Sequence, residues 1–133
     1  MSYFVTHLEG AIDGTVLSAD QPHTLHAGRP ILVRYDLPTI ARTVSRDDIS
    51  RRPSTLWRYR ELLSVPPQAE VVTLGEGCTP LLAAPRLGAS LGLANLWVKD
   101  ESQLPTGSFK SRGMALAVTM AKHFGFSQLA VPT

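Results

Sequence analysis

The first 36 residues of the chain contain short apolar stretches separated by glycine-containing turns. Residues 3–6, 15–17 and 31–35 each have the apolar and β-branched character of a strand. Three strands this short bury little core of their own and must pack against another part of the chain. The pattern therefore predicts a small β-hairpin module over residues 1–36.

From residue 37 onward the pattern changes to helical periods separated by polar links. Apolar positions over residues 56–63 and 81–91 recur at the spacing of an amphipathic helix. Residues 36–38 and 47–53 are polar and contain proline, which predicts irregular links.

The last third of the chain predicts a strand, a helix and a second strand. Residues 95–99 are expected to form a buried strand, and residues 108–124 a helix that is apolar nearly all round and hence a buried core helix. Residues 129–131 are expected to begin the next strand. This order over residues 95–132 indicates a βαβ unit, and therefore a parallel sheet with a right-handed crossover.

The predicted fold class is thus α/β, with a hairpin module over residues 1–36 and the start of a doubly wound parallel sheet over residues 37–133. An all-apolar helix needs covering layers on every side, and 133 residues barely provide them. We therefore expect the chain to be the truncated N-terminal portion of a longer protein.

Composition limits the classes of function. A hydrophobic content of 44% with 18% charged residues predicts an ordinary soluble globular protein. The single cysteine excludes a disulfide framework, and no apolar run approaches the roughly 20 residues of a membrane span. A secretion signal is also missing, so the predicted location is the cytoplasm. The arginines near Trp57 and Tyr59 predict a solvated helix face with two buried aromatic rings, not a nucleic-acid interface.

Lys110 stands at the start of the apolar helix, just after the loop Pro-Thr-Gly-Ser and Phe109. The free N–H groups and positive dipole end of a helix N-terminus suit an anionic ligand. The same field and partial burial disfavour a protonated ammonium, which biases the amine toward a nucleophile. Phe109 can lay its ring beside a planar group. The alternative is a lysine that extends from a buried helix to solvent, with Ser108 as the N-cap.

Residues 99–113 resemble the lysine signature of the fold type II pyridoxal-phosphate enzymes. In that signature an acidic residue, a spacer, Ser/Thr, any residue and Ser/Ala precede an aromatic residue, the lysine and Arg-Gly. The matching residues are Glu101, Thr106, Ser108, Phe109, Lys110, Arg112 and Gly113. The resemblance implies a tryptophan synthase β-like fold, a Schiff base between pyridoxal 5′-phosphate and Lys110, and packing of Phe109 on the cofactor ring.

Within fold type II, the chain looks most like the threonine synthase family. Residues 75–82, Gly-Glu-Gly-Cys-Thr-Pro-Leu-Leu, resemble a segment found upstream of the lysine in that family. The family activity is that of a carbon–oxygen lyase, which converts O-phospho-L-homoserine and water to L-threonine and phosphate. The resemblance also suggests that Glu101 and Arg112 orient the loop through an ion pair, with a simple surface pair as the alternative. Cys78 is expected to be a small apolar filler.

The hairpin module departs from the family pattern. Many threonine synthases of this branch carry paired cysteines in the two turns of the module, followed by a Val-x-Tyr-Asp strand such as residues 33–36. Here the cysteines are absent, so we predict no metal and a degenerate, zinc-ribbon-like module. A zinc site on His7, His23 and His26 is the alternative.

A second departure follows Lys110. The Ser/Thr-x-Gly-Asn turn and the glycine-rich phosphate loop of the family do not occur in the sequence. We therefore expect this chain alone to bind the cofactor weakly or not at all, and to be inactive by itself. The expected partner is a small amino-acid substrate, and a homodimer is compatible with the resemblance. The alternatives are another fold type II enzyme, such as a cysteate synthase or an amino-acid ammonia-lyase, or a non-enzymatic fragment that retains Lys110 by descent.

Overall fold

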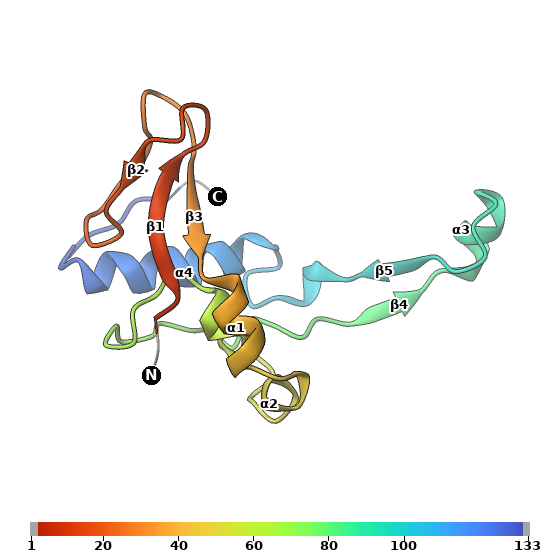
Figure 1. Cartoon of the computed structure of the whole chain (residues 1–133). Coiled ribbons are helices and arrows are strands. Elements are labelled where there is room, and N and C mark those ends of the chain that lie inside the picture. The colour runs from red at the N-terminus through yellow and green to blue at the C-terminus, as the bar shows by residue number, and fades with distance from the viewer. Residues whose placement is uncertain (1–2, 132–133) are drawn as a thin grey trace.

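The computed structural model describes residues 3–131, and its N-terminal part is a three-stranded antiparallel sheet (Figure 1). The strands lie in the order β2 (Val16–Leu17), β1 (Val5–Gly10) and β3 (Ile31–Tyr35). Leu8 of the central strand pairs with β2 on one side and with β3 on the other. The three strands form where the sequence predicts them, although the first begins at Val5 and extends to Gly10.

A hydrogen bond between side chains ties the two turns at the far end of this sheet together. His26 Nε2 donates to Asp13 Oδ2 at 2.9 Å, across 13 residues of chain. The backbone N–H of Thr15 also donates to Asp13, at 3.1 Å. These two contacts, that of Thr15 first, lower the pKa of the Asp13 carboxyl to about 2.

The two segments expected to be irregular links instead hold two short helices, α1 (Leu37–Thr43) and α2 (Arg46–Ser50). Each has a side chain that caps its N-terminus. Asp36 accepts a backbone N–H three residues further on, at 3.0 Å. Ser45 and Asp48 form a reciprocal capping box at the start of α2. The prediction of irregular links was wrong because these caps stabilise short helices that apolar periodicity does not reveal.

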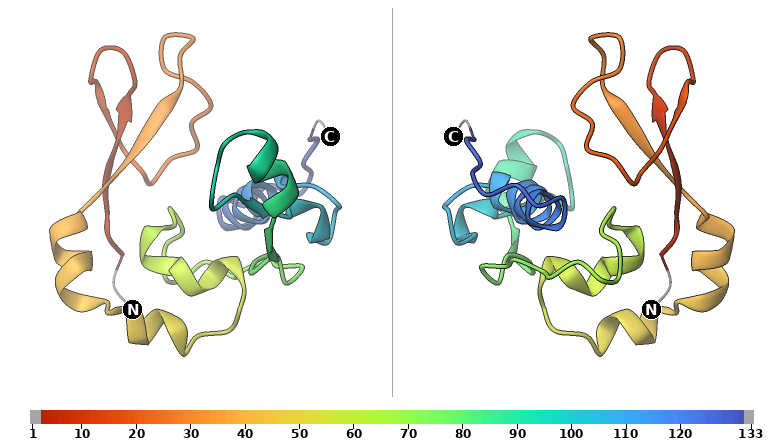
Figure 2. Two further views of the ribbon diagram at one scale, coloured as in Figure 1. Left: turned by 90° about the vertical axis from the view of Figure 1, so that its right-hand side faces the viewer. Right: turned by 90° about the vertical axis from the view of Figure 1, so that its left-hand side faces the viewer.

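The helix expected over residues 56–63 is a 3₁₀-helix, η1 (Leu56–Leu62), interrupted at Tyr59, where φ is −102° and ψ is 28°. Arg52 holds its far end, because its guanidinium makes two bonds of 2.7 and 2.9 Å to the carboxylate of Glu61. Figure 2 shows the sheet module and α4 standing side by side, with α1, α2 and η1 joining them at the base.

Residues 81–99 form an arm that projects away from the rest of the molecule (Figure 1). The arm consists of β4 (Leu81–Ala83), α3 (Pro85–Ser90) at its tip, and β5 (Trp97–Lys99). The two strands are antiparallel, and every residue in them is exposed. The predicted helix over residues 81–91 therefore starts only at Pro85, and the predicted buried strand at residues 95–99 is exposed.

A short 3₁₀-helix, η2 (Glu101–Gln103), and a loop lead into the longest helix, α4 (Lys110–His123). Only Ser111, Ala115 and Thr119 of α4 are buried, and this spacing of four residues marks a single face. The expectation of a helix buried on all sides was wrong, because no layer of residues 3–131 covers the other faces.

The second strand of the predicted βαβ unit does not form. Residues 129–131 have no strand structure, and Pro132 lies outside the described residues. Strands β1 to β5 pair only antiparallel, so the parallel pair is not present within residues 3–131. A strand needs neighbours for its backbone groups and its two faces, and α4 alone supplies neither.

The exposed surface of the molecule is 9188 Å². A compact monomer of this mass exposes about 6,800 Å², so the arm and the uncovered faces of α4 add substantially to the surface. Across residues 3–131, no helix combines the length and the apolar character required to cross a membrane.

Candidate functional site

Lys110 is the first residue of α4. The helix thus begins two residues after the start predicted from the sequence. Its backbone N–H lies 3.3 Å from Ser108 Oγ, so Ser108 contributes to the cap although the helix proper begins after Phe109. The Lys110 side chain is exposed, and within residues 3–131 its amine makes no hydrogen bond or ion pair. The amine is therefore accessible to a ligand from solvent.

Phe109 is also exposed, with 67% of its surface open to solvent. Its ring is free to lie against a planar group beside Lys110. The structure therefore leaves the role that the resemblance implies for Phe109 as a prediction.

Arg112, in the first turn of α4, forms a two-point ion pair with Glu101. The Nε atom lies 2.7 Å from Glu101 Oε2, and Nη2 lies 3.0 Å from Oε1. This geometry gives two parallel charge-assisted bonds. The predicted ion pair is confirmed, and it joins η2 to the helix turn that starts with Lys110.

Thr79 from the upstream segment completes this cluster. Its hydroxyl donates to Glu101 Oε1, and Arg112 Nη2 lies 3.4 Å from the same hydroxyl. Its carbonyl accepts a hydrogen bond from Lys99 Nζ. Arg112 and, after it, Thr79 lower the pKa of Glu101 to about 2, so the carboxylate is ionised at neutral pH.

Glu76 fixes the other half of the upstream segment. Its side chain is fully buried, and its carboxylate accepts hydrogen bonds from Trp57 Nε1 at 3.0 Å, the Leu74 N–H at 2.8 Å and the Thr73 hydroxyl at 3.0 Å. Each donor offsets part of the cost of burying a polar group. The anchoring role of Glu76 is not predictable from the sequence, because its hydrogen-bond partners come from two separate segments.

Cys78 lies between these two anchors and does not fill an apolar gap. Its side chain is exposed, and the residue adopts a left-handed backbone conformation with φ of 43°. Arg58 Nη1 lies 3.3 Å from the sulfur. Hydrogen bonds from Arg58 and then Ser54 lower the pKa of the thiol. The expectation of a small apolar filler was wrong, because a guanidinium 20 residues away in sequence reaches the sulfur.

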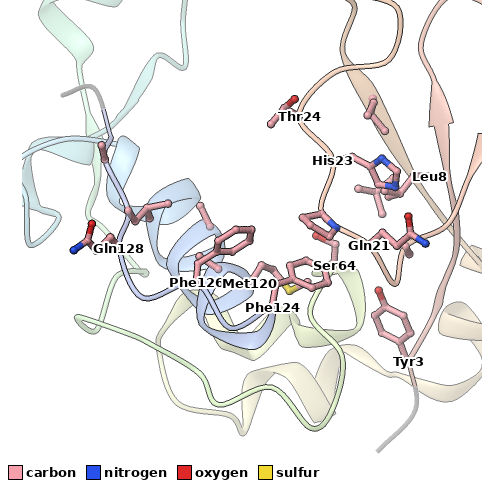
Figure 3. A pocket seen from close by; sticks show the side chains of 18 residues that line it. Tyr3, Leu8, Gln21, His23, Thr24, Ser64, Met120, Phe124, Phe126 and Gln128 are labelled. Carbon is pink, nitrogen blue, oxygen red and sulfur yellow. The ribbon is translucent and has the colours of Figure 1, made fainter.

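Two cavities flank α4. One of about 310 Å³ lies over Gly77, Cys78, Lys99, Glu101 and Arg112 and does not include Lys110. The other, of about 890 Å³, lies at the opposite end of the helix, between Met120 and Phe124 on one side and Tyr3 and His23 on the other (Figure 3). Neither cavity contains the predicted cofactor lysine.

The three histidines of the alternative zinc site have separate partners. His7 Nδ1 lies 3.0 Å from the Thr6 hydroxyl, His23 Nε2 donates to the Ser18 carbonyl at 2.9 Å, and His26 pairs with Asp13. Over residues 3–131, no three His, Cys, Asp or Glu side chains are grouped as metal ligands.

Comparison with known proteins identifies the segment that contains this cluster. Residues 72–133 match the family described as pyridoxal-phosphate dependent enzymes. Individual relatives narrow this further. The threonine synthase of Methanocaldococcus jannaschii is 40% identical over 103 residues, which are 77% of this chain and 25% of that protein. The predicted resemblance to threonine synthases is confirmed.

Two other relatives give the same result. The threonine synthase of Methanosarcina acetivorans is 39% identical over 98 residues, which are 74% of this chain and 23% of the relative. That of Mycobacterium leprae is 49% identical over 69 residues, 52% of this chain and 19% of the relative. The chain spans about a quarter of the length of the first curated relatives it matches. No solved structure matches it significantly.

The described residues fit one part of a bound pyridoxal phosphate. Lys110 offers an accessible amine at a helix N-terminus, which suits covalent attachment of an anionic cofactor. A glycine-rich phosphate loop is not part of the sequence after Lys110, where Gly113 and Gly125 stand alone. The residues thus supply the covalent anchor and the cluster beside it.

Proposed function

We propose that this chain is the cofactor-attaching portion of a threonine synthase, with Lys110 as the residue that binds pyridoxal 5′-phosphate covalently. One observation carries the proposal. Lys110, whose amine has no partner among residues 3–131, begins α4 in a turn that the Glu101–Arg112 ion pair ties to the preceding loop, inside the segment that matches the family. The proposed reaction is the conversion of O-phospho-L-homoserine and water to L-threonine and phosphate.

The roles of the residues follow from their positions. Pyridoxal phosphate, when bound, supplies an electron sink for charge that develops on the substrate carbons. Lys110 Nζ would hold the cofactor covalently and would serve as the group that carries protons to and from the substrate carbons. Phe109 would pack beside the cofactor ring. Arg112 and Glu101 hold the turn from which Lys110 extends.

We further propose that the groups that bind the cofactor phosphate are not part of this chain. Without them the cofactor binds Lys110 weakly, so the chain by itself makes no threonine. Of the alternatives, a cysteate synthase or ammonia-lyase has less support, because the relatives compared above are each named threonine synthase. We place the protein in the cytoplasm on the basis of its sequence.

Attachment is tested directly by trapping. The chain is incubated with pyridoxal phosphate, reduced with borohydride, digested and analysed by mass spectrometry. It has only three lysines, so Lys99 and the half-exposed Lys122 serve as internal controls. We expect a pyridoxyl-phosphate adduct mainly at Lys110, and its loss in Lys110→Arg but not in Lys122→Arg. Equal labelling of Lys110 and Lys122 would contradict the assignment.

Activity is tested in a chimaera. The matching segment of the Methanocaldococcus jannaschii threonine synthase is replaced by the aligned 103 residues of this chain. We expect the chimaera to form threonine and phosphate, and its Lys110→Ala variant to form neither. A folded chimaera that binds the cofactor without turnover would instead favour a non-enzymatic segment that retains Lys110.

A further inference from the structure

We propose that Thr79 is a positioning residue for Lys110, acting through Glu101 and Arg112. Neither the family match nor the resemblance of the lysine segment assigns it this role. Thr79 belongs to the upstream Gly-Glu-Gly-Cys-Thr-Pro segment, and Lys110 begins a helix 31 residues later. The inference rests on the proposed function for the role of Lys110 in cofactor attachment. The part that concerns how Thr79 holds the first turn of α4 does not depend on it.

Two backbone hydrogen bonds that join the start of α4 to the preceding loop are long. The Ser111 N–H reaches the Ser108 carbonyl at 3.3 Å, and the Arg112 N–H reaches the Phe109 carbonyl at 3.3 Å. Both distances exceed the usual 2.9–3.0 Å of a backbone hydrogen bond. Side-chain contacts must therefore contribute to holding this turn in place.

Thr79 supplies such a contact to both members of the ion pair. Its hydroxyl donates to Glu101 Oε1 and lies 3.4 Å from Arg112 Nη2, on the acceptor side. A hydroxyl is able to do both at once, because it has one donor and two acceptor lone pairs. Thr79 thus fixes the carboxylate that in turn fixes the guanidinium two residues after Lys110.

Thr79 is itself held firmly enough to act as a reference point. It is only 7% exposed, and Lys99 donates to its carbonyl. Three residues earlier, buried Glu76 anchors the same loop to Trp57. Its backbone carbonyl also accepts the Leu56 N–H at 2.6 Å. A shift of Thr79 would therefore require η1 or β5 to move.

The test compares Thr79→Val, which keeps the shape and removes the hydroxyl, with Thr79→Ser, which keeps the hydroxyl. Glu70→Gln is the matched control, because it breaks the exposed pair of Glu70 with Lys122 near the other end of α4. Three readouts are used on the full chain: the rate of borohydride-trapped pyridoxyl adduct at Lys110, hydrogen exchange of the Lys110–Gly113 amides, and the pKa of Glu101 from its carboxyl ¹³C shift.

In Thr79→Val we expect trapping at Lys110 to slow about tenfold, in line with the sensitivity of covalent reactions to small misplacements of the reacting group. The amides of the first turn should exchange faster, and the pKa of Glu101 should rise because one of its donors is gone. Thr79→Ser and Glu70→Gln should match the wild-type chain in all three readouts. Glu101→Gln serves as a second variant if Thr79→Val does not fold, and should slow trapping in the same way.

Normal trapping and normal amide exchange in folded Thr79→Val would overturn the positioning role. So would a Thr79→Ser variant that behaves like Thr79→Val, because the hydroxyl would then not be the active group. If the wild-type chain shows no adduct at Lys110, the proposed function fails separately. Amide exchange and the Glu101 titration then still decide whether Thr79 holds the turn.

Discussion

Replacing Gly77 with alanine tests how closely the loop that carries Thr79 packs against η1. A Cβ atom at Gly77 would lie 2.7 Å from both the carbonyl carbon and the Cα of Thr55, and 2.8 Å from the Leu56 nitrogen. These are backbone atoms, so no side-chain rotation relieves the clash. The φ of Gly77 is 148°, a region that residues with a Cβ rarely adopt.

The magnitude follows from these two effects. Overpacking in a well-packed site costs about 1–3 kcal/mol. A sparsely populated backbone conformation adds about 1–3 kcal/mol. We therefore expect Gly77→Ala to lower the free energy of unfolding by about 2–6 kcal/mol, measured by urea denaturation with far-UV circular dichroism and tryptophan fluorescence.

Two other glycines supply the controls. Gly75 also has a positive φ, 80°, but nothing lies within 4 Å of a Cβ there, so Gly75→Ala should cost only about 1–2 kcal/mol. Gly113 lies inside α4 with open space around it, and Gly113→Ala should stabilise the chain by about 0.5–1 kcal/mol. If Gly77→Ala cost no more than Gly75→Ala, the close approach of the loop to η1 would be refuted.

Three further predictions concern single contacts. Trp57→Phe should lower the free energy of unfolding, measured by urea denaturation, by about 1–3 kcal/mol, because it removes a hydrogen-bond donor from the buried side chain of Glu76. Trp97→Phe on the exposed arm is the control and should change this free energy little. Leu104→Ala should lower the free energy of unfolding by about 2–5 kcal/mol, because this residue is only 4% exposed. A smaller loss would indicate that neighbouring side chains move in to fill the cavity. Folding lowers the pKa of Asp13 from 3.8 to about 2. The ionised carboxylate therefore contributes fully to the free energy of unfolding above pH 3.8, and this contribution is lost as the pH falls toward 2. Asp13→Asn should remove this part of the acid dependence of the urea midpoint, and an unchanged slope between pH 4 and 2 would contradict the structure.

Local sequence signals predicted the short elements well where the determinants are close in sequence. The strands of the N-terminal sheet, the start of α4 and the ion pair between Glu101 and Arg112 all depend on residues near one another or on a recognisable motif. The capped helices α1 and α2 were missed although their signals are local, since a Ser-x-x-Asp box outweighs the lack of an apolar stripe in so short a segment.

Long-range features were not predictable in this way. The burial of α4 on one face only, and the exposure of β5, depend on which layers cover them, and the sequence pattern does not encode what lies opposite. Arg58 reaches Cys78, and Trp57 reaches Glu76, only because η1 packs against the loop. No periodicity in either segment indicates these contacts.

The two segments that carry the resemblance to threonine synthases are joined in the structure by Thr79, Glu101 and Arg112, and this predicts that substitutions in the two segments are not independent. Contacting residues generally show non-additive effects, whereas distant ones add. In a double-mutant cycle, the loss of stability for Thr79→Val combined with Glu101→Gln should be clearly smaller than the sum of the single losses, because either change already breaks their shared hydrogen bond. Thr79→Val combined with Glu70→Gln should be additive, since Glu70 pairs with Lys122 near the far end of α4. If the losses of stability for Thr79→Val and Glu101→Gln simply add, the hydrogen bond between Thr79 and Glu101 does not couple the two segments.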